Sequence, residues 1–268
     1  MLARVVFASA ALLPCARGGA QVESPQTVAA ARATVADAEA WGAAENPAAR
    51  PVGRFAVSAY GHHALELPDL GRVGLDLGWA RGASHFALGV QAFTPPGYSA
   101  FAVHLGAGRM LTPGLEAGLR LGLVRRDVGE YGREVQPTAQ VGIQYRAGRR
   151  LVAGAHYSYA SAPVLPLSEH RLRVGIDYTS SRRVHILLAI WQAVDAGLTG
   201  GVSLRYDAAE RLRFRVGAQG GGTAFTLGVE GELAGGLRLA ISTAIYQQLP
   251  PGASAGVMWV RAPTALVD

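Results

Sequence analysis

Apolar and polar residues alternate along most of this chain. Leu212, Phe214 and Val216 alternate with Arg213 and Arg215, so the apolar side chains point one way and the arginines the other. A pleated strand produces this period of two, and a helix does not. The same alternation returns in segment after segment, separated by short connections. One face of each predicted strand therefore favours apolar surroundings, and the opposite face favours water or charged partners.

The alternating segments predict about fourteen strands, most of them near the nine to eleven residues that cross a bilayer at a tilt. They cover residues 54–61, 72–80, 84–93, 98–109, 115–125, 137–146, 151–160, 171–179, 184–194, 201–207, 211–219, 224–233, 237–247 and 253–261. An even number of strands of this length favours an all-β fold, a closed antiparallel transmembrane β-barrel over residues 51–268. The alternative is a soluble sandwich whose two sheets bury their apolar faces in a shared core.

The predicted connections differ between the two ends of the strands. Even-numbered strands are followed by tight turns such as AGRR and SSRR, whereas the first, third, fifth and seventh are followed by longer or proline-rich loops such as HHALELPDLG. An outer-membrane barrel with both termini in the periplasm has this asymmetry, and a soluble sandwich has no reason for it. Aromatic residues near the strand ends suit two girdles at the membrane interfaces: Tyr60, Trp79, Phe93, Tyr98, Tyr157, Tyr159, Tyr178, Trp191, Tyr206, Tyr246 and Trp259.

The composition fits a membrane barrel better than a soluble domain. Hydrophobic residues make up 50% of the chain, charged residues only 16%, and there are 35 glycines. Glycine at this level inside alternating segments indicates strands that bend or pack closely. No apolar run approaches the roughly 20 residues of a transmembrane helix. A membrane crossing therefore requires a closed barrel.

Residues 1–20 have the pattern of a secretory signal peptide. Arg4 precedes an apolar run, and small residues follow it at cleavage-site spacing. A mature chain that starts near Gln21 lacks Cys15, the single cysteine, which excludes disulfides and cysteine-ligated metals. The alternative is a lipoprotein acylated on Cys15, but Pro14 argues against that cleavage site.

Residues 21–50 are rich in alanine and lack the alternation. Their middle predicts a short helix over about residues 27–40. Asn46-Pro47 ends any helix, because the residue before proline is pushed out of the α region. The segment is either a loose leader to the first strand or a small plug folded into the mouth of the barrel.

The end of this segment, Trp41-Gly42-Ala43-Ala44-Glu45-Asn46-Pro47-Ala48, resembles the N-terminal NPA segment of the FadL/PorV-like superfamily of outer-membrane β-barrel proteins, which includes PorV/PorQ-like members. The resemblance implies a fourteen-stranded barrel whose leader forms a hatch in the lumen, with Trp41, Asn46 and Pro47 as plug residues. It also implies one of two activities. FadL-like members pass hydrophobic compounds, and PorV-like members carry cargo for type IX secretion.

The formal net charge is +6, the isoelectric point is about 9.9, and no lysine occurs, so arginine supplies the fixed positive charge. The arginines are spread singly along the predicted strands and turns, with acidic residues among them. We interpret them as a mixed-charge surface that faces solvent or the lumen, and we predict no nucleic-acid partner.

If the apolar faces look outward, the polar faces line the lumen. The predicted lumen-lining residues are Asp76, Glu116, Arg120, Gln140, Gln144, Arg146, Arg173, Asp177, Arg205, Arg213, Arg215, Glu230, Glu232 and Arg238. Charges of opposite sign on neighbouring strands are expected to pair across the sheet. The lining either fills a narrow barrel or forms a weakly cationic path for anionic or amphipathic solutes.

No stretch of the sequence predicts an enzyme. Ser254 lies in a GxSxG pattern, but this nucleophile motif requires a turn from a strand into a helix, and no helix is predicted after it. His62, His63 and Glu66 offer metal ligands in the first loop without the spacing of a known zinc motif, so a solvated loop is the better interpretation. We therefore predict no catalytic residue, no metal and no cofactor.

The first functional hypothesis is a monomeric, non-enzymatic barrel in the outer membrane of a two-membrane bacterium. It contacts outer-membrane lipid and passively takes up or holds a small hydrophobic or amphipathic solute. The second is a secretion-associated barrel of the PorV/PorQ type, whose loops bind proteins of the secretion system. The third is an outer-membrane lipid-modifying enzyme, with Ser254 or His156 as its reactive residue.

Overall fold

A computed structural model of the chain describes residues 27–28, 30, 33–37, 45–51, 53–63, 71–129, 132–161, 169–193, 197–220, 224–247 and 250–261. The expected signal peptide, residues 1–20, and Trp41 lie outside these described residues. Within them, no helix is both long and apolar enough to cross a membrane.

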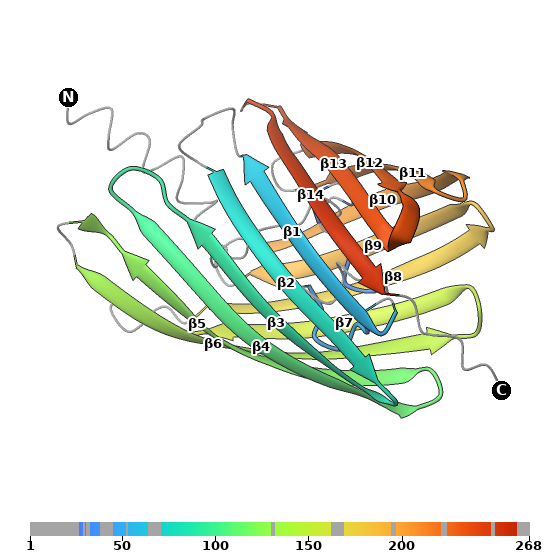
Figure 1. The fold of residues 1–268 in the computed structure, drawn as a ribbon, viewed down its shortest axis with the longest axis horizontal. Coiled ribbons are helices and arrows are strands. Elements are labelled where there is room, and N and C mark those ends of the chain that lie inside the picture. Colours follow the sequence, from blue (N-terminus) through green and yellow to red (C-terminus); the bar gives the residue numbers. More distant parts are fainter. Residues whose placement is uncertain are drawn as a thin grey trace.

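Fourteen antiparallel strands form a closed barrel, in which each strand pairs with its neighbours in sequence and the first pairs with the last (Figure 1). The strands are β1 (Phe55–His63), β2 (Gly71–Arg81), β3 (Ser84–Phe93), β4 (Ser99–Thr112), β5 (Leu115–Asp127), β6 (Arg133–Ala147), β7 (Leu151–Ala160), β8 (Glu169–Ser181), β9 (Val184–Ala193), β10 (Gly197–Ala209), β11 (Leu212–Gln219), β12 (Ala224–Glu232), β13 (Leu237–Tyr246) and β14 (Gly252–Arg261). The predicted closed all-β barrel is confirmed, and the sandwich alternative is wrong, because the two terminal strands pair with each other.

The largest differences between predicted and observed strand ends include the start of β6. The sequence places this start at Pro137, but β6 begins at Arg133. Proline lacks an amide proton but keeps its carbonyl, and the Pro137 oxygen accepts a hydrogen bond from the Ser161 amide at 3.2 Å. Arg133 pairs with Asp127 across the hairpin, and their side chains form an ion pair at 3.2 Å. The hairpin therefore extends past its proline.

The connections sort by length between the two ends of the barrel, as predicted. Tight turns follow the even-numbered strands, at residues 82–83, 113–114, 148–150, 182–183, 210–211 and 233–236. They gather at one end, the tight-turn rim, on the right of Figure 1. Gly114 has a φ of 94°, a left-handed conformation that favours glycine and suits a two-residue hairpin turn. At the opposite end, the loop rim, seven residues separate the end of β1 from the start of β2, and eight separate β7 from β8.

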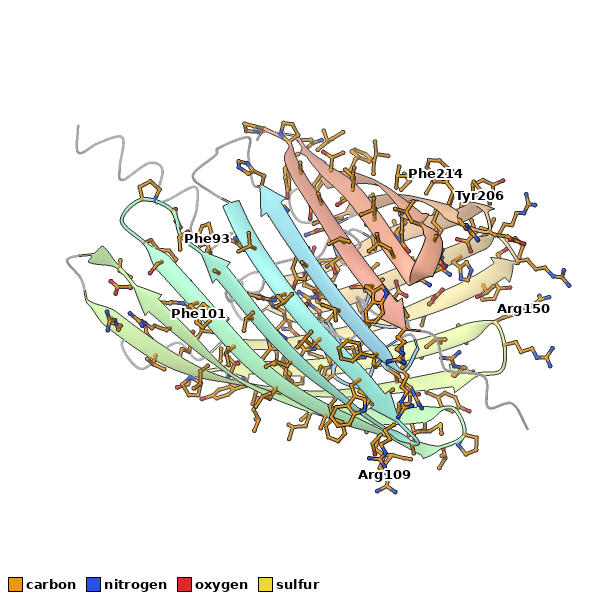
Figure 2. The ribbon with its side chains drawn as sticks, in the orientation of Figure 1. Phe93, Phe101, Arg109, Arg150, Tyr206 and Phe214 are labelled. Atoms are coloured by element: carbon orange, nitrogen blue, oxygen red, sulfur yellow. The ribbon has the colours of Figure 1, made fainter. Side chains whose placement is uncertain are left out.

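The outer surface of the barrel is apolar, and the inner face is polar or small. On β12, Phe225 and Leu227 are 57% and 46% exposed, whereas Thr226 and Glu230 are 3% and 6% exposed. Phe214, labelled in Figure 2, belongs to the same outer surface. Monomeric soluble proteins rarely expose apolar patches larger than a few hundred Å². The barrel is therefore inverted relative to a soluble domain.

Large exposed aromatic side chains form a band on the outer surface near the tight-turn rim. This aromatic belt consists of Trp79, Phe86, Tyr145, Tyr178, Tyr206, Phe214 and Trp259. Two aromatic residues assigned to the girdles from sequence, Tyr60 and Trp191, lie inside instead, each 5% exposed. Polar partners hold them there, because Tyr60 donates a hydrogen bond to Asp76 at 2.8 Å and the Trp191 ring lies 5.8 Å from the Arg173 guanidinium carbon.

Exposed arginines gather at the tight-turn rim, contrary to the even spread inferred from sequence. This arginine ring consists of Arg54, Arg81, Arg109, Arg146, Arg149, Arg150, Arg182, Arg183, Arg211 and Arg261. Elsewhere in the described part of the chain, the exposed arginines are Arg125 and Arg133, near the loop rim. The turns are far apart in sequence, so only closure of the barrel brings these charges together.

Barrel closure can be tested by linking β1 to β14. Ala59 and Val257 are register partners, and paired antiparallel residues lie within the Cα separation that a disulfide spans. In a Cys15→Ser background, A59C/V257C is expected to form an intramolecular disulfide under mild oxidation, seen as a mobility shift that reduction reverses. A59C/V229C, which places the second thiol on β12, is the control. Equal crosslinking of the two pairs would contradict the closed order of strands.

Candidate functional site in the barrel interior

Part of the N-terminal segment lies among the inward-facing side chains of the barrel. Residues 33–37 and 45–49, here called the inner segment, are buried. The inner segment, blue in Figure 1, contacts β3, β6, β8 and β11. These four strands are spread around the closed sheet. The interior therefore has to be described as this segment together with the wall that surrounds it.

The helix expected over residues 27–40 is wrong for the first part of the inner segment. The Asp37 amide donates to the Thr34 carbonyl at 2.9 Å, which closes a single turn. The carbonyl oxygen of Ala36 accepts a hydrogen bond from Gln144 Nε2 on the wall at 2.8 Å. Contacts with the wall thus replace the hydrogen bonds that a helix would make.

Asn46 is fully buried and organises the second part of the inner segment. Its Oδ1 accepts a hydrogen bond from the Ala48 amide at 3.0 Å, which forms an Asx turn. Its Nδ2 donates to the Val35 carbonyl at 2.9 Å and lies 3.4 Å from a carbonyl oxygen of β6. On β3, His85 Nε2 donates to the Pro47 carbonyl at 3.0 Å. The Asn-Pro pair therefore joins both parts of the inner segment to the wall.

Glycines on the inner face let this segment lie directly against the strands. A Cβ atom built on Gly118 would lie 2.0 Å from the Pro47 carbonyl oxygen, and one built on Gly142 would lie 2.1 Å from Asn46 Oδ1. Both distances are shorter than any real Cβ contact. Gly118 and Gly142 are register partners on β5 and β6, and Gly154 on β7 approaches the segment in the same way. A side chain at these positions would displace the segment.

Two buried ion pairs hold the inner segment to opposite charges on the wall. Arg173 Nη1 on β8 lies 2.9 Å from Glu45 Oε2, and Arg215 Nη2 on β11 lies 3.1 Å from Asp37 Oδ2. None of the four side chains is more than 7% exposed. Removing one partner of a buried pair leaves an uncompensated charge and costs about 3–5 kcal/mol. These contacts therefore resist release of the segment.

Hydrogen bonds link β1 to β2 and β3, and a close contact adds β4 to the group. Tyr60 donates to Asp76 Oδ2 at 2.8 Å, and Gln91 Nε2 donates to the Tyr60 hydroxyl at 3.2 Å. His104 Nε2 lies 3.3 Å from Asp76 Oδ1. The Tyr60 ring covers Gly74, where a Cβ atom would lie 2.5 Å from the ring. Here again glycine makes room for an inward-facing group.

The residues predicted to line the lumen occupy inward positions with different burial. Buried ones are Arg120, Gln140, Gln144, Arg173, Asp177, Arg205, Arg215 and Glu230. Half-buried ones are Asp76, Glu116, Arg213, Glu232 and Arg238, while Arg146 is exposed at the end of β6. Their role in solute passage stays a prediction.

Opposite charges pair across the sheet on β11, β12 and β13. Arg213 Nη1 lies 3.1 Å from Glu230 Oε1, and Arg238 Nε lies 3.1 Å from Glu232 Oε2. Each pair consists of register partners, as expected for charges on neighbouring strands. The arginines that hold the inner segment do not follow this rule, because their partners are not on a strand.

Gln136 on β6 is buried, and neither polar atom of its amide has a hydrogen-bond partner in the described part of the structure. Its register partner Val124, and Ala102 next to Val124, are buried as well. A buried polar group without a partner costs about 1–3 kcal/mol. This place, toward the loop rim, combines a small apolar surface with one amide that can bond a ligand.

The side chains that the sequence offered for catalysis or metal binding take part in the structure of the barrel wall or lie outside the described residues. The Ser254 hydroxyl donates to the Gly61 carbonyl at 2.9 Å, and its strand continues to Arg261, so the nucleophile turn does not form. His156 is buried on β7. Glu66 lies outside the described residues, and among those described no three His, Cys, Asp or Glu side chains form a group that could hold a metal.

Asp37, Glu45 and the inward glycines were missed by the sequence pattern. One signal for the acids exists, because residues 33–49 contain three acidic and no basic residues, while the predicted inner face is rich in arginine. The glycines carry no comparable signal, since a strand glycine looks the same whether it faces a segment or empty space. The two kinds of residue therefore differ in how far sequence can identify them.

The sequence matches no protein family and no curated protein. Solved structures with the same fold include the toluene transporter TodX of P. putida, at a TM-score of 0.65 and 11% identity, covering 90% of this chain and 100% of that one. The CymD monoaromatic hydrocarbon channel has a TM-score of 0.62 and 11% identity, covering 83% and 93%. A FadL homologue of Pseudomonas aeruginosa has a TM-score of 0.61 and 9% identity, covering 89% and 97%. Likeness at these identities establishes a shared barrel fold with FadL-type proteins, and the PorV/PorQ part of the resemblance stays a prediction.

The glycine contacts predict that a side chain at Gly142 displaces the inner segment. Overpacking a close contact costs typically 1–3 kcal/mol, so Gly142→Leu is expected to accelerate maleimide labelling of A48C, in a Cys15→Ser background, by about fivefold or more. Ala48 is fully buried, so slow labelling is expected without the leucine. Gly231→Leu is the matched control, because a Cβ there meets no atom within 4 Å. Equal labelling rates in the two leucine variants would contradict the close approach.

Proposed function

We propose that this protein is a monomeric outer-membrane β-barrel, which admits or holds small hydrophobic or amphipathic molecules. The apolar outer surface supports a lipid setting, because exposed leucine and phenylalanine side chains gain free energy in hydrocarbon at roughly 25 cal/mol per Å². A closed barrel leaves no unpaired strand edge, which is the requirement for crossing a bilayer with strands. The sorted turns and loops suit an outer membrane in particular.

The observation that carries the proposal is the inner segment, fixed in the interior by ion pairs and glycine contacts. We propose that residues 21–50 act as a plug, in which Asn46 and Pro47 make the central contacts. Exchange of solute past the plug then requires the segment to shift or to leave a narrow side passage. Because both anchoring acids lie on the segment, neutralising them loosens the plug without altering any strand.

The hydrophobic character of the solute rests on two kinds of support. Structures that share this fold carry the names of a toluene transporter and a monoaromatic hydrocarbon channel. In this chain, Gln136 lies beside its register partner Val124, which in turn pairs with Ala102 on the next strand. An apolar molecule with one hydroxyl or carbonyl group would satisfy the amide while burying its remaining surface. Arg173 and Arg215, by contrast, serve to position the plug.

Neither alternative function gains support from a specific contact. Ser254 donates its hydroxyl hydrogen to a backbone carbonyl within a strand, which does not favour nucleophilic chemistry. Nothing in the described contacts favours a secretion partner. Passive exchange of a small solute is therefore the function that the interior supports best.

Loss of the two anchoring charges is expected to open the barrel. In planar bilayers, D37N/E45Q should raise conductance above that of the unmodified chain, and deletion of residues 21–50 should raise it further. The expected reason is that Arg215 and Arg173 lose their partners, at about 3–5 kcal/mol for each broken pair. The matched control is D207N/E232Q, which makes the same two chemical changes in wall ion pairs that do not involve the inner segment. Absence of current and of bound ligand in both opened forms would contradict the proposal.

The amide of Gln136 is expected to select for a polar group on the solute. Gln136→Leu should weaken binding of 4-methylphenol by about two- to tenfold, the value of one neutral hydrogen bond, and leave binding of 1,4-dimethylbenzene unchanged or stronger. The two probes have the same shape and differ in a hydroxyl against a methyl group. Calorimetric titration of the detergent-solubilised protein measures both affinities. Gln192→Leu, at an exposed position on β9, is the control. An equal effect of both substitutions would rule out a hydrogen bond between Gln136 and the hydroxyl group of the solute.

A further inference from the structure

The tight-turn rim carries a concentration of positive charge that the interior does not use. The ten side chains of the arginine ring are exposed, and none forms an ion pair with an acidic residue in the described part of the chain. Figure 2 shows Arg109 and Arg150 extending from this end of the barrel. Among the described acidic residues at this rim, Glu210 is the exposed one. The rim is therefore a largely uncompensated cationic surface.

The loop rim differs in this respect. Its two exposed arginines lie close to one acid, with Arg133 Nε 3.2 Å and Arg125 Nη2 4.0 Å from Asp127 Oδ2. The two exposed arginines of the loop rim thus have a carboxylate partner beside them, whereas those of the arginine ring have none among the described residues. A binding role for arginine is thus concentrated at one end of the molecule.

The position of the ring relative to the aromatic belt indicates what it meets. Trp79 comes two residues before Arg81 on β2, and Trp259 comes two residues before Arg261 on β14. Two strand residues span about 7 Å. Tryptophan and tyrosine belts lie at the boundary between hydrocarbon and headgroups. The guanidinium groups consequently lie just beyond that boundary, at the level of lipid phosphates.

We infer that the arginine ring is a binding surface for the phosphate groups of anionic phospholipids in the leaflet around the tight-turn rim. Arginine suits this ligand, because its planar guanidinium donates two parallel hydrogen bonds to phosphate oxygens. The inference rests on the membrane setting of the proposed function. Its effect is to fix the depth and orientation of the barrel, with the tight turns on the side of the anionic headgroups.

A nucleic acid is the other polyanion that such charge attracts, and the arrangement disfavours it. Proteins that bind single strands place aromatic side chains beside the basic groove, where bases stack on them. Here the aromatic side chains point outward from the wall into the same band as the exposed aliphatic residues of the strands. A lipid, with a phosphate next to hydrocarbon, matches both chemical surfaces at once.

The test uses the full chain in neutral detergent, incubated with equal amounts of dioleoylphosphatidylglycerol and dioleoylphosphatidylcholine. After repurification, mass spectrometry counts the bound molecules of each lipid. Each arginine near an anionic surface contributes a factor of about five in affinity. The unmodified protein should therefore retain an excess of phosphatidylglycerol that falls at least about fivefold in R182Q/R183Q and further in R149Q/R150Q/R182Q/R183Q. The matched control R125Q/R133Q, at the loop rim, should keep the excess.

Flotation of the protein with vesicles of phosphatidylcholine alone separates failure of this inference from failure of the proposed function. A protein that does not enter these neutral vesicles contradicts the membrane setting itself. A protein that enters them but binds both lipids equally overturns the arginine-ring inference alone, and so does an excess that survives the fourfold substitution. Binding of heparin without any excess of phosphatidylglycerol would assign the ring to a soluble polyanion and overturn it as well.

Discussion

Pairing between β1 and β14 is the interaction on which the rest of this structure depends. It joins the ends of the sheet, so every strand has a hydrogen-bonding neighbour on both sides. A closed sheet has one inside and one outside, and the period of two then assigns each side chain to one of them. Because the large apolar side chains fall outside, the interior is left with polar and small residues. The outer apolar surface, the polar interior and the two unlike rims all follow from this closure.

The interior accepts an irregular piece of chain because the wall satisfies its backbone. Buried carbonyl groups need donors, and the wall and the segment itself supply them through Gln144, His85 and Asn46. Glycines permit the close approach, and arginines meet the two buried acids. These are separate physical requirements, namely space, hydrogen bonding and charge. Their coincidence around one segment is what keeps that segment in the interior.

The two rims of the barrel differ in their connections and in their exposed side chains. One end has tight turns, an aromatic belt and arginines that form no ion pair with a described acidic residue, while the other has longer connections and the amide of Gln136, which has no hydrogen-bond partner among the described residues. Such polarity gives a barrel a preferred orientation in an asymmetric membrane. In the proposed function, it separates the surface that meets lipid headgroups from the end at which solute enters. The interior chemistry and the rim chemistry are independent, since the arginine ring and the inner-segment ion pairs share no residue.

From the sequence alone came the fourteen strands, their two faces and the sorting of turns from loops, because each of these is a local property of alternation and turn composition. The expected helix was wrong at residues 33–37, and so were the girdle positions of Tyr60 and Trp191, because tertiary hydrogen bonds and a cation–aromatic contact outweighed local preference. Only the tertiary structure decided that Glu45 meets Arg173 across 128 positions of chain and that arginines from many turns form one ring. Strand register and barrel closure determine these long-range contacts, and no single stretch of the sequence specifies either of them.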